Sequence, residues 1–97
     1  MIVLIEGTYR VPDLAVARPH METMVSASRA EDGCISYAFS SDLLDPNLIH
    51  VAERWQSREH LAAHAATNHM ATWRAAAAEL GVSDRALRIY DAEPQDL

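Results

Sequence analysis

Residues 50–73 read HVAERWQSREHLAAHAATNHMATW and contain four of the five histidines and both tryptophans of the chain. Up to Trp55 the side chains alternate between two faces, which predicts a strand with one face toward the core. Ser57 suits the N-cap position of a following helix. Thr67-Asn68 can end that helix and cap another, so the stretch predicts one strand and a helical region that is broken once.

Outside this stretch, the same patterns predict three more strands and a long helix. Residues 2–11, 35–41 and 86–92 are rich in β-branched and aromatic types, as is the strand over 48–55. In strand 35–41, Ile35, Tyr37 and Phe39 are expected to share one face. Residues 13–31 carry apolar side chains at helical spacing, and the second helical region should end at Leu80. Pro19 lies inside the first helix, where it either kinks the helix or marks the start of its regular part.

The resulting order, β-α-β-β-α-β, is that of the ferredoxin-like α+β fold, with a four-stranded antiparallel sheet and helices on one face. Residues 1–97 are expected to form a single domain. Strand 2–11 is apolar on both faces near its start, and strand 86–92 has apolar residues on both. Because the helices cover only one face, the other face needs separate cover. A second copy of the chain would supply it, so we expect a homodimer.

Composition narrows the classes of function. A net charge of −6, with eight arginines that do not cluster, argues against a nucleic-acid partner. No apolar run reaches the roughly 20 residues that cross a bilayer, and residues 1–7 do not resemble a signal peptide, so we expect a cytoplasmic protein with no membrane partner. Cys34 is the only cysteine, which excludes an internal disulfide, and we expect it to be a buried small hydrophobe.

Several short motifs together resemble the antibiotic biosynthesis monooxygenase family over nearly the whole chain. They are GCISY at 33–37, DPN at 45–47, ERW at 53–55, SRE at 57–59, Leu61-x-x-His64 and His69-Met70. The resemblance implies a dimeric α+β barrel with a ligand pocket between the sheet and the helices of each monomer. It also implies an oxidation of polycyclic phenols or quinols by molecular oxygen, without metal or flavin.

The family also includes haem-degrading enzymes, and this branch is the least similar to the sequence. It uses an Asn on the first strand, a Trp in the second helical region and a proximal His further on. The corresponding places here hold Gly7, His64 and Arg74. We therefore expect no haem and no other cofactor.

The resemblance makes His64 the first candidate for catalysis and His69 the second. A cofactor-free oxygenase needs a group that accepts the phenolic proton, and histidine titrates near neutrality. His64 follows Leu61 by three residues, so it should point toward the sheet with it. A histidine that is merely hydrogen-bonded at the edge of the core is an equally good interpretation of His64. For His69, a capping or surface position is favoured slightly over a functional one.

Two other histidines, His50 and His60, are expected to be structural, with His60 on the exposed side of its helix. The i, i+4 spacing of His60 and His64 is compatible with zinc, with His69 or Glu59 as a third ligand. Such pairs are common on helices by accident, so no metal is expected.

Six further residues are candidates for binding the substrate. They are Tyr37, Glu53, Trp55, Leu61, Met70 and Trp73. Flat aromatic surface suits an aromatic ligand, although Trp55 and Trp73 equally suit packing in the core. If the face that carries Glu53 meets the helices, its carboxylate is buried and needs a partner, with Arg10, Arg88 or a histidine as candidates. Otherwise Glu53 would form an ion pair with the dimer partner.

The sequence thus favours a cofactor-independent monooxygenase that acts on a small phenolic or quinol-type aromatic with molecular oxygen. One alternative is a non-catalytic dimer that binds a ligand or serves in a stress response. Another is an isomerase, cyclase or decarboxylase that uses the same pocket, because this fold hosts several reactions.

Overall fold

The computed structural model describes all 97 residues and contains four strands and three helices. The elements are β1 (Ile2–Arg10), α1 (Leu14–Arg29), β2 (Cys34–Ser41), β3 (Leu48–Trp55), α2 (Arg58–Ala65), α3 (Asn68–Leu80) and β4 (Ser83–Ala92). This is the predicted ferredoxin-like order with the second helical region divided in two. None of the helices is long and apolar enough to cross a membrane.

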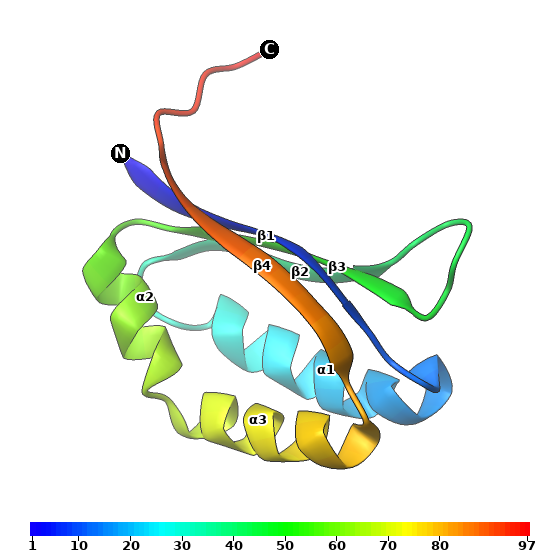
Figure 1. The fold of residues 1–97 in the computed structure, drawn as a ribbon. Helices are drawn as coiled ribbons and strands as arrows, with labels where there is room; N and C mark the ends of the chain where they lie inside the picture. The colour runs from blue at the N-terminus through cyan, green and yellow to red at the C-terminus, as the bar shows by residue number, and fades with distance from the viewer.

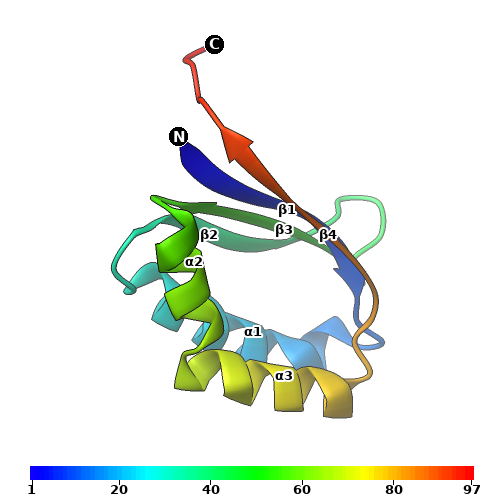
Figure 2. The ribbon, with the colours of Figure 1, turned by 60° about the vertical axis from the view of Figure 1, so that its left-hand side comes forward.

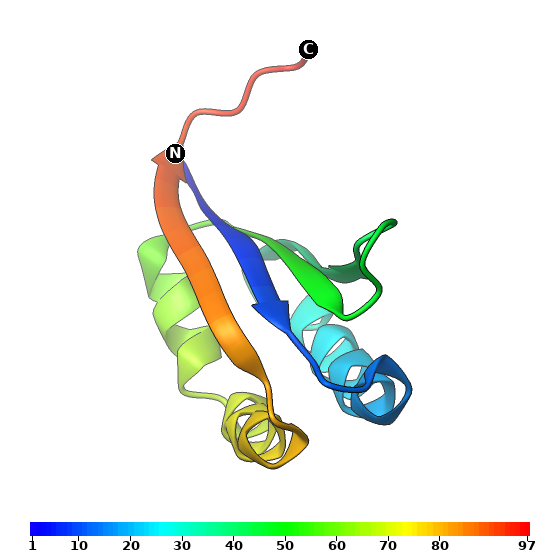
Figure 3. The same ribbon diagram turned by 45° about the vertical axis from the view of Figure 1, so that its right-hand side comes forward.

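The strands form one antiparallel sheet in the order β2-β3-β1-β4. All three helices lie on the same side of it, as Figure 1 shows, and the opposite face is bare. Helices α1 and α3 run side by side beneath the sheet, while α2 descends from the end of β3 at one edge (Figure 2). Strand β4 forms one edge of the sheet and lies above α3 (Figure 3).

Helix α1 begins where Asp13 caps it, since the Asp13 carboxylate accepts from the backbone N–H groups of Ala15 and Val16. The regular helix therefore starts before Pro19, which excludes the possibility that its regular part begins at this proline. Its buried stripe consists of Ala17, Met21, Met24 and Ser28. This stripe packs on β2 and β3 and positions the C-terminal end of α1 beside α2.

The break between α2 and α3 occurs at the predicted place. Ser57 caps α2 by accepting from the His60 N–H, and Thr67 caps α3 by accepting from the Met70 N–H. Gly81 ends α3 in the left-handed conformation, at φ 75°. The chain turns at this break, so α2 and α3 cover different parts of the sheet.

Two small clusters form the core, and the partly buried Phe39 and Trp73 pack against both. One joins Tyr9, Val11, Ala17, Met21, Ile49 and Val51, and the other joins Val3, Met24, Tyr37 and Trp55. Helix α3 has no buried residue, although Met70, Trp73, Ala77 and Leu80 form its more covered stripe as predicted. Helix α3 therefore does not close tightly on the sheet, and a cavity lies between them.

One predicted face was wrong in β2. The register between β2 and β3 shifts between Cys34 and Ser36, so an irregularity at this point removes Ile35 from the face of Tyr37 and Phe39. Tyr37 is buried, whereas the Ile35 side chain is 48% exposed. Period-two alternation cannot anticipate a bulge because it assumes an unbroken ladder.

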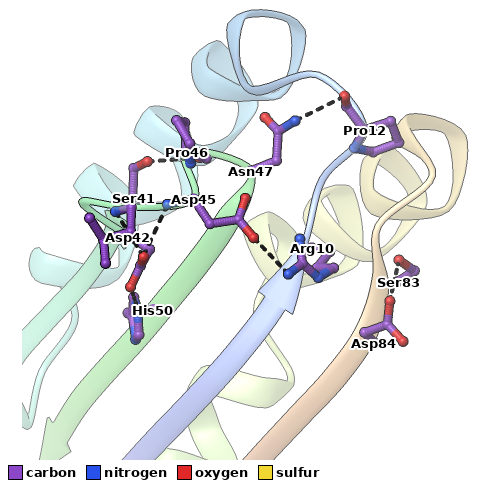
Figure 4. Close-up of polar contacts among 11 residues, drawn as sticks. Arg10, Pro12, Ser41, Asp42, Asp45, Pro46, Asn47, His50, Ser83 and Asp84 are labelled. Atoms are coloured by element: carbon purple, nitrogen blue, oxygen red, sulfur yellow. Dashed lines mark hydrogen bonds and ion pairs between the residues drawn. The ribbon is translucent and has the colours of Figure 1, made fainter.

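The predicted turn at residues 42–47 is held by short polar contacts at one end of the sheet (Figure 4). Asp42 binds His50 at 2.8 Å, and Arg10 donates to Asp45 at 2.7 Å. This pairing overturns Arg10 as the partner of Glu53, because its guanidinium reaches the turn instead. The tip of the turn exposes Leu43 and Leu44 almost completely, and it rises from the sheet on the side away from the helices (Figure 1).

Candidate active site

A cavity of about 700 Å³ lies between the inner face of the sheet and the helices α2 and α3. Its volume is in the range of small-molecule pockets. Fourteen of its 19 lining residues are hydrophobic, so it suits an apolar ligand. A few polar side chains interrupt this surface, and they are the candidates for chemistry.

Strand register places the floor of the cavity. One cross-strand row consists of Tyr37, Glu53, Ile5 and Ile89, and the next consists of Phe39, Val51, Gly7 and Leu87. Gly7 has φ 152°, and a Cβ there would lie 2.0 Å from the carbonyl oxygen of Ala86. This close approach between β1 and β4 requires glycine, and it leaves the centre of the floor without a side chain.

Three aromatic rings meet on the wall nearest α3. Tyr9 and Phe39 pack edge to face with ring centroids 5.6 Å apart, and Trp73 lies 6.0 Å from Tyr9 and 5.7 Å from Phe39. All three line the cavity. Because Trp73 comes from a helix and the other two from strands, this cluster spans the gap and offers flat apolar surface to an aromatic ligand.

The polar centre of the site is a carboxylate shared by two histidines. Glu31 follows the C-terminus of α1, and its Oε2 lies 2.5 Å from Nδ1 of His64 and 2.9 Å from Nε2 of His69. The His64 side chain is 4% exposed, that of Glu31 14% and that of His69 23%. The His64 ring also packs on Trp55, with ring centroids 4.6 Å apart. His64 is therefore held firmly on two sides.

This arrangement defines the state of the His64 ring. A carboxylate only accepts hydrogen bonds, so Nδ1 donates to Glu31 and Nε2 is the nitrogen that remains for a ligand. His64 lines the cavity, whereas Glu31 does not. The pair thus has the chemistry of an oriented base, with the carboxylate fixing the ring tautomer from behind.

Glu53 is the second polar group on the floor. It is 6% exposed and accepts the indole N–H of Trp55 at 3.0 Å. Burial raises the pKa of its carboxyl, although this hydrogen bond opposes the shift. The face of Glu53 therefore meets the helices, and its hydrogen-bond partner is Trp55 rather than Arg10, Arg88 or a histidine.

Two tyrosines add hydroxyl groups to the polar groups of the cavity, which also include Arg74, Arg85 and Arg88. Burial raises the pKa of both Tyr9 and Tyr37 above the usual phenol value, so each keeps its proton and serves as a donor. The Tyr9 hydroxyl is buried and has no hydrogen-bond partner in the protein. Because such groups are usually satisfied, this hydroxyl is an unsatisfied polar group beside the cavity.

Comparison with known proteins agrees with this geometry. The model of the family described as antibiotic biosynthesis monooxygenase matches residues 17–76, more than half of the chain. The chain belongs to this family. No significant match was found among proteins of curated function.

Solved structures share the fold over nearly the full length. A Deinococcus radiodurans protein, named for antibiotic biosynthesis monooxygenase, superposes with a TM-score of 0.89 at 25% identity, covering 100% of this chain and 97% of its own. Rv0793 of Mycobacterium tuberculosis superposes with a TM-score of 0.76 at 26% identity, covering 100% of this chain and 98% of its own. A Bacteroides thetaiotaomicron protein is described as of unknown function and a possible oxidoreductase. It superposes with a TM-score of 0.81 at 25% identity, covering 92% of this chain and 95% of its own.

Within this family domain, the structure brings six of the eight predicted site residues onto the cavity wall. They are Tyr37, Glu53, Leu61, His64, Met70 and Trp73. Trp55 and His69 do not line the cavity. Trp55 is fully buried behind His64 and binds Glu53, while His69 binds Glu31. Both residues support the wall from outside.

The remaining histidines lie elsewhere. His50 is on the opposite face of the sheet, where it binds Asp42. His60 is not simply exposed, as the sequence suggested, because its ring bonds the Ser57 hydroxyl at 2.7 Å and fills the space beside Gly33.

One group of side chains could hold a metal ion, and it differs from the set that the sequence suggested. The ligand atoms of Glu31, His64 and His69 all lie within 4.8 Å of one another. Two histidines and a carboxylate suit a divalent transition metal. In the structure the three groups already satisfy one another by hydrogen bonds. Neither His60 nor Glu59 belongs to the group.

The sequence reasoning missed Glu31 and Tyr9. Glu31 was interpreted only as part of the segment that ends the first helix. Yet it follows Met24 and Ser28 at helical spacing, on the same stripe as the buried residues, and this signal could have found it. Tyr9 lies two and four residues after Gly7 and Ile5 on the inner face of β1, so alternation along the strand was the signal for it.

Proposed function

We propose that the protein is a cofactor-independent monooxygenase that oxidises a phenolic or quinol-type aromatic with molecular oxygen. The observation that carries this proposal is the oriented His64, which lines an apolar cavity while Glu31 holds its Nδ1 at 2.5 Å. Family membership supports the reaction class. The chemistry requires a base and an aromatic site, and the cavity contains a histidine and an aromatic wall that suit these roles.

In the proposed reaction, the aromatic body of the substrate packs against Tyr9, Phe39 and Trp73. The phenolic oxygen faces His64, whose Nε2 accepts the proton. Glu31 stabilises the imidazolium that forms, as the carboxylate of a catalytic triad does. The substrate anion is then electron-rich enough to reduce oxygen.

The balance of the reaction requires no external reductant. An anthrone-type substrate reacts as its enol, in which one hydrogen of the reacting carbon has moved to the phenolic oxygen, and His64 accepts this proton. Overall, the reacting carbon loses two hydrogens and gains one oxygen atom as a carbonyl. The second oxygen atom leaves as water with those two hydrogens. Four electrons thus pass from the substrate to O₂, and the proton held by His64 is returned to the departing oxygen.

Oxygen uptake with a panel of anthrones and quinols tests the proposal, using protein freed of metal by chelation and without flavin. We expect uptake that depends on the protein and, under ¹⁸O₂, one labelled oxygen atom in the product. A product formed without added oxygen would instead indicate an isomerase, cyclase or decarboxylase. Binding without turnover would indicate a ligand-binding protein.

We also propose that the protein is a homodimer that pairs through the bare face of the sheet. Only 14 of the 97 residues are buried within one chain. The bare face carries Leu4 and, beside it on β4, the 40% exposed Tyr90. The turn between β2 and β3, which contains the exposed Leu43 and Leu44, extends on the same side of the sheet (Figure 1). Exposed apolar groups gathered on one side are typical of an interface.

Light scattering tests this assembly, because one chain has a mass of 10.7 kDa. A mass near that of two chains is expected at micromolar concentration. The variant Leu44→Asp should shift the measured mass toward that of one chain. The control Val16→Asp makes the same kind of change on the exposed surface of α1 and should not shift the mass. A wild-type mass near that of one chain would contradict the dimer.

A further inference from the structure

The break between α2 and α3 brings two histidines to one carboxylate. His64 lies in the last turn of α2 and His69 in the first turn of α3. Their i, i+5 spacing would not place them on one face of a continuous helix, but across the break their ring centroids are only 5.9 Å apart. Glu31, at the end of α1, bonds both rings through Oε2. Three separate segments thus aim three potential metal ligands at one point.

The three ligand atoms lie within reach of one ion. One such atom from each of Glu31, His64 and His69 lies within 4.8 Å of the other two. In a tetrahedral zinc site with bonds of about 2.0–2.1 Å, neighbouring ligand atoms are roughly 3.3 Å apart. Oε2 of Glu31 is 2.5 Å and 2.9 Å from the two ring nitrogens, so it needs to withdraw by less than about 1 Å to admit the ion.

Solvent reaches this group without passing through the cavity. His64 lines the cavity, but Glu31 and His69 do not. The side chain of His69 is 23% exposed and that of Glu31 14%, so an ion enters from the outer side, where water can complete its coordination. No arginine forms an ion pair with Glu31, and the net charge of the chain is −6. The local charge therefore favours a cation.

A metal ion at this point would exchange the roles of the two nitrogens of His64. In the hydrogen-bonded state Nδ1 carries the ring proton, because the Glu31 carboxylate only accepts. A metal ion needs the lone pair of Nδ1, so the proton of the neutral ring moves through solvent to Nε2. Nε2 is the nitrogen left for a ligand, and with a proton on it this atom donates instead of accepting. The ring gains no net proton, and no electron is transferred.

We propose that Glu31, His64 and His69 bind a divalent transition-metal ion such as Zn²⁺, and that the bound ion converts the cavity-facing nitrogen of His64 from an acceptor into a donor. Two imidazoles and one carboxylate are a ligand set that suits such ions. The ion is an inhibitory ligand and not a cofactor, because it takes the side of the ring that faces away from the cavity. The metal site and the change of tautomer follow from these contacts, and only the inhibition of turnover rests on the proposed function.

Calorimetric titration of the metal-free protein with ZnCl₂ tests the site. We expect one ion per chain, bound at micromolar concentration. His69→Gln and Glu31→Gln should each weaken binding by more than about tenfold, the least that a lost partner costs at a metal site. Because Glu31 also holds the buried His64, the partly exposed His69 provides the variant whose folding is least at risk. His60→Gln is the matched control, since it removes the i, i+4 neighbour of His64 and should bind zinc as wild type does.

Long-range ¹H–¹⁵N correlation spectra show which nitrogen of each histidine ring carries the proton. In the wild type, zinc should move the proton of His64 from Nδ1 to Nε2. In His69→Gln at the same zinc concentration, the proton should stay on Nδ1. Saturating zinc should also lower the oxygen uptake of the wild type by about tenfold or more, while the uptake of His69→Gln should stay at its own metal-free rate.

Four results would overturn the proposal. They are no binding of zinc at micromolar concentration, binding that His69→Gln leaves unchanged, binding that His60→Gln weakens equally, and an unchanged tautomer of His64 in the zinc-bound protein. Neither the titration nor the spectra depend on turnover. If zinc binds and shifts the proton but the protein consumes no oxygen, or consumes it at an unchanged rate, the metal site stands and the role of His64 as the base of a monooxygenase is refuted alone.

Discussion

Removing the carboxylate of Glu31 should destabilise the fold as well as the site. In Glu31→Ala, His64 loses the partner of its Nδ1 while its side chain remains 4% exposed, so water cannot fully replace the lost bond. An unsatisfied buried donor costs about 1–3 kcal/mol. His69 is 23% exposed and can turn to water, so its lost bond adds little. We therefore expect the free energy of unfolding to fall by about 2–3 kcal/mol.

Urea denaturation followed by tryptophan fluorescence measures this loss, at one fixed protein concentration because a dimer unfolds with concentration dependence. Glu22→Ala is the matched control, since Glu22 forms an exposed pair with Arg18 at 2.7 Å and should cost less than about 0.5 kcal/mol. A double-mutant cycle with His64→Ala isolates the contact. A Glu31→Ala loss no larger than that of the control, or zero coupling to His64, would show that the Glu31–His64 hydrogen bond does not stabilise the fold.

Three further predictions concern single side chains. Because burial raises the folded-state pKa of Glu53, folding favours its protonated form, and stability is lost as pH rises through that raised pKa. Glu53→Gln should therefore be more stable than wild type at neutral pH but not near pH 4. A difference in urea midpoint between variant and wild type that stays constant with pH would contradict this. Gly7→Ala should lower the free energy of unfolding by about 3 kcal/mol or more, because its Cβ would lie 2.0 Å from Ala86 O at φ 152°. Gly81→Ala, whose Cβ has its nearest contact at 3.1 Å, should lower it by about 1 kcal/mol. Equal shifts in thermal midpoint for the two variants would exclude the close approach at Gly7. Burial raises the pKa of the partly buried Cys34 thiol. Iodoacetamide at pH 8 should therefore alkylate Cys34 more slowly than free cysteine. An equal rate of alkylation would contradict the partial burial of Cys34.

The fold could be predicted from sequence because its determinants are local. Asp13 and Ser57 cap helices at their predicted places, Thr67 restarts the second helical region, and Gly81 ends it. Each of these signals acts within a turn of helix. Ile35 was misplaced because a bulge depends on the register of two strands, which no single strand reveals.

The site was predicted less completely because its contacts are distant in sequence. Glu31 meets His64 and His69 across separations of 33 and 38 residues. Trp55 was expected at the pocket, but the bond that its indole makes to Glu53 turns it behind the wall. Which of several polar side chains meet depends on how helices seat on the sheet, and residue spacing does not contain that information.

The role of His64 as the base is tested most directly by oxygen uptake of His64→Ala beside His20→Ala, which removes an exposed histidine of α1. On the substrate that turns over best, we predict a loss of about 100-fold or more in kcat for His64→Ala, partly rescued by added imidazole. His20→Ala should match wild type, and circular dichroism should show both variants folded. Unchanged turnover in a folded His64→Ala would exclude His64 as the base.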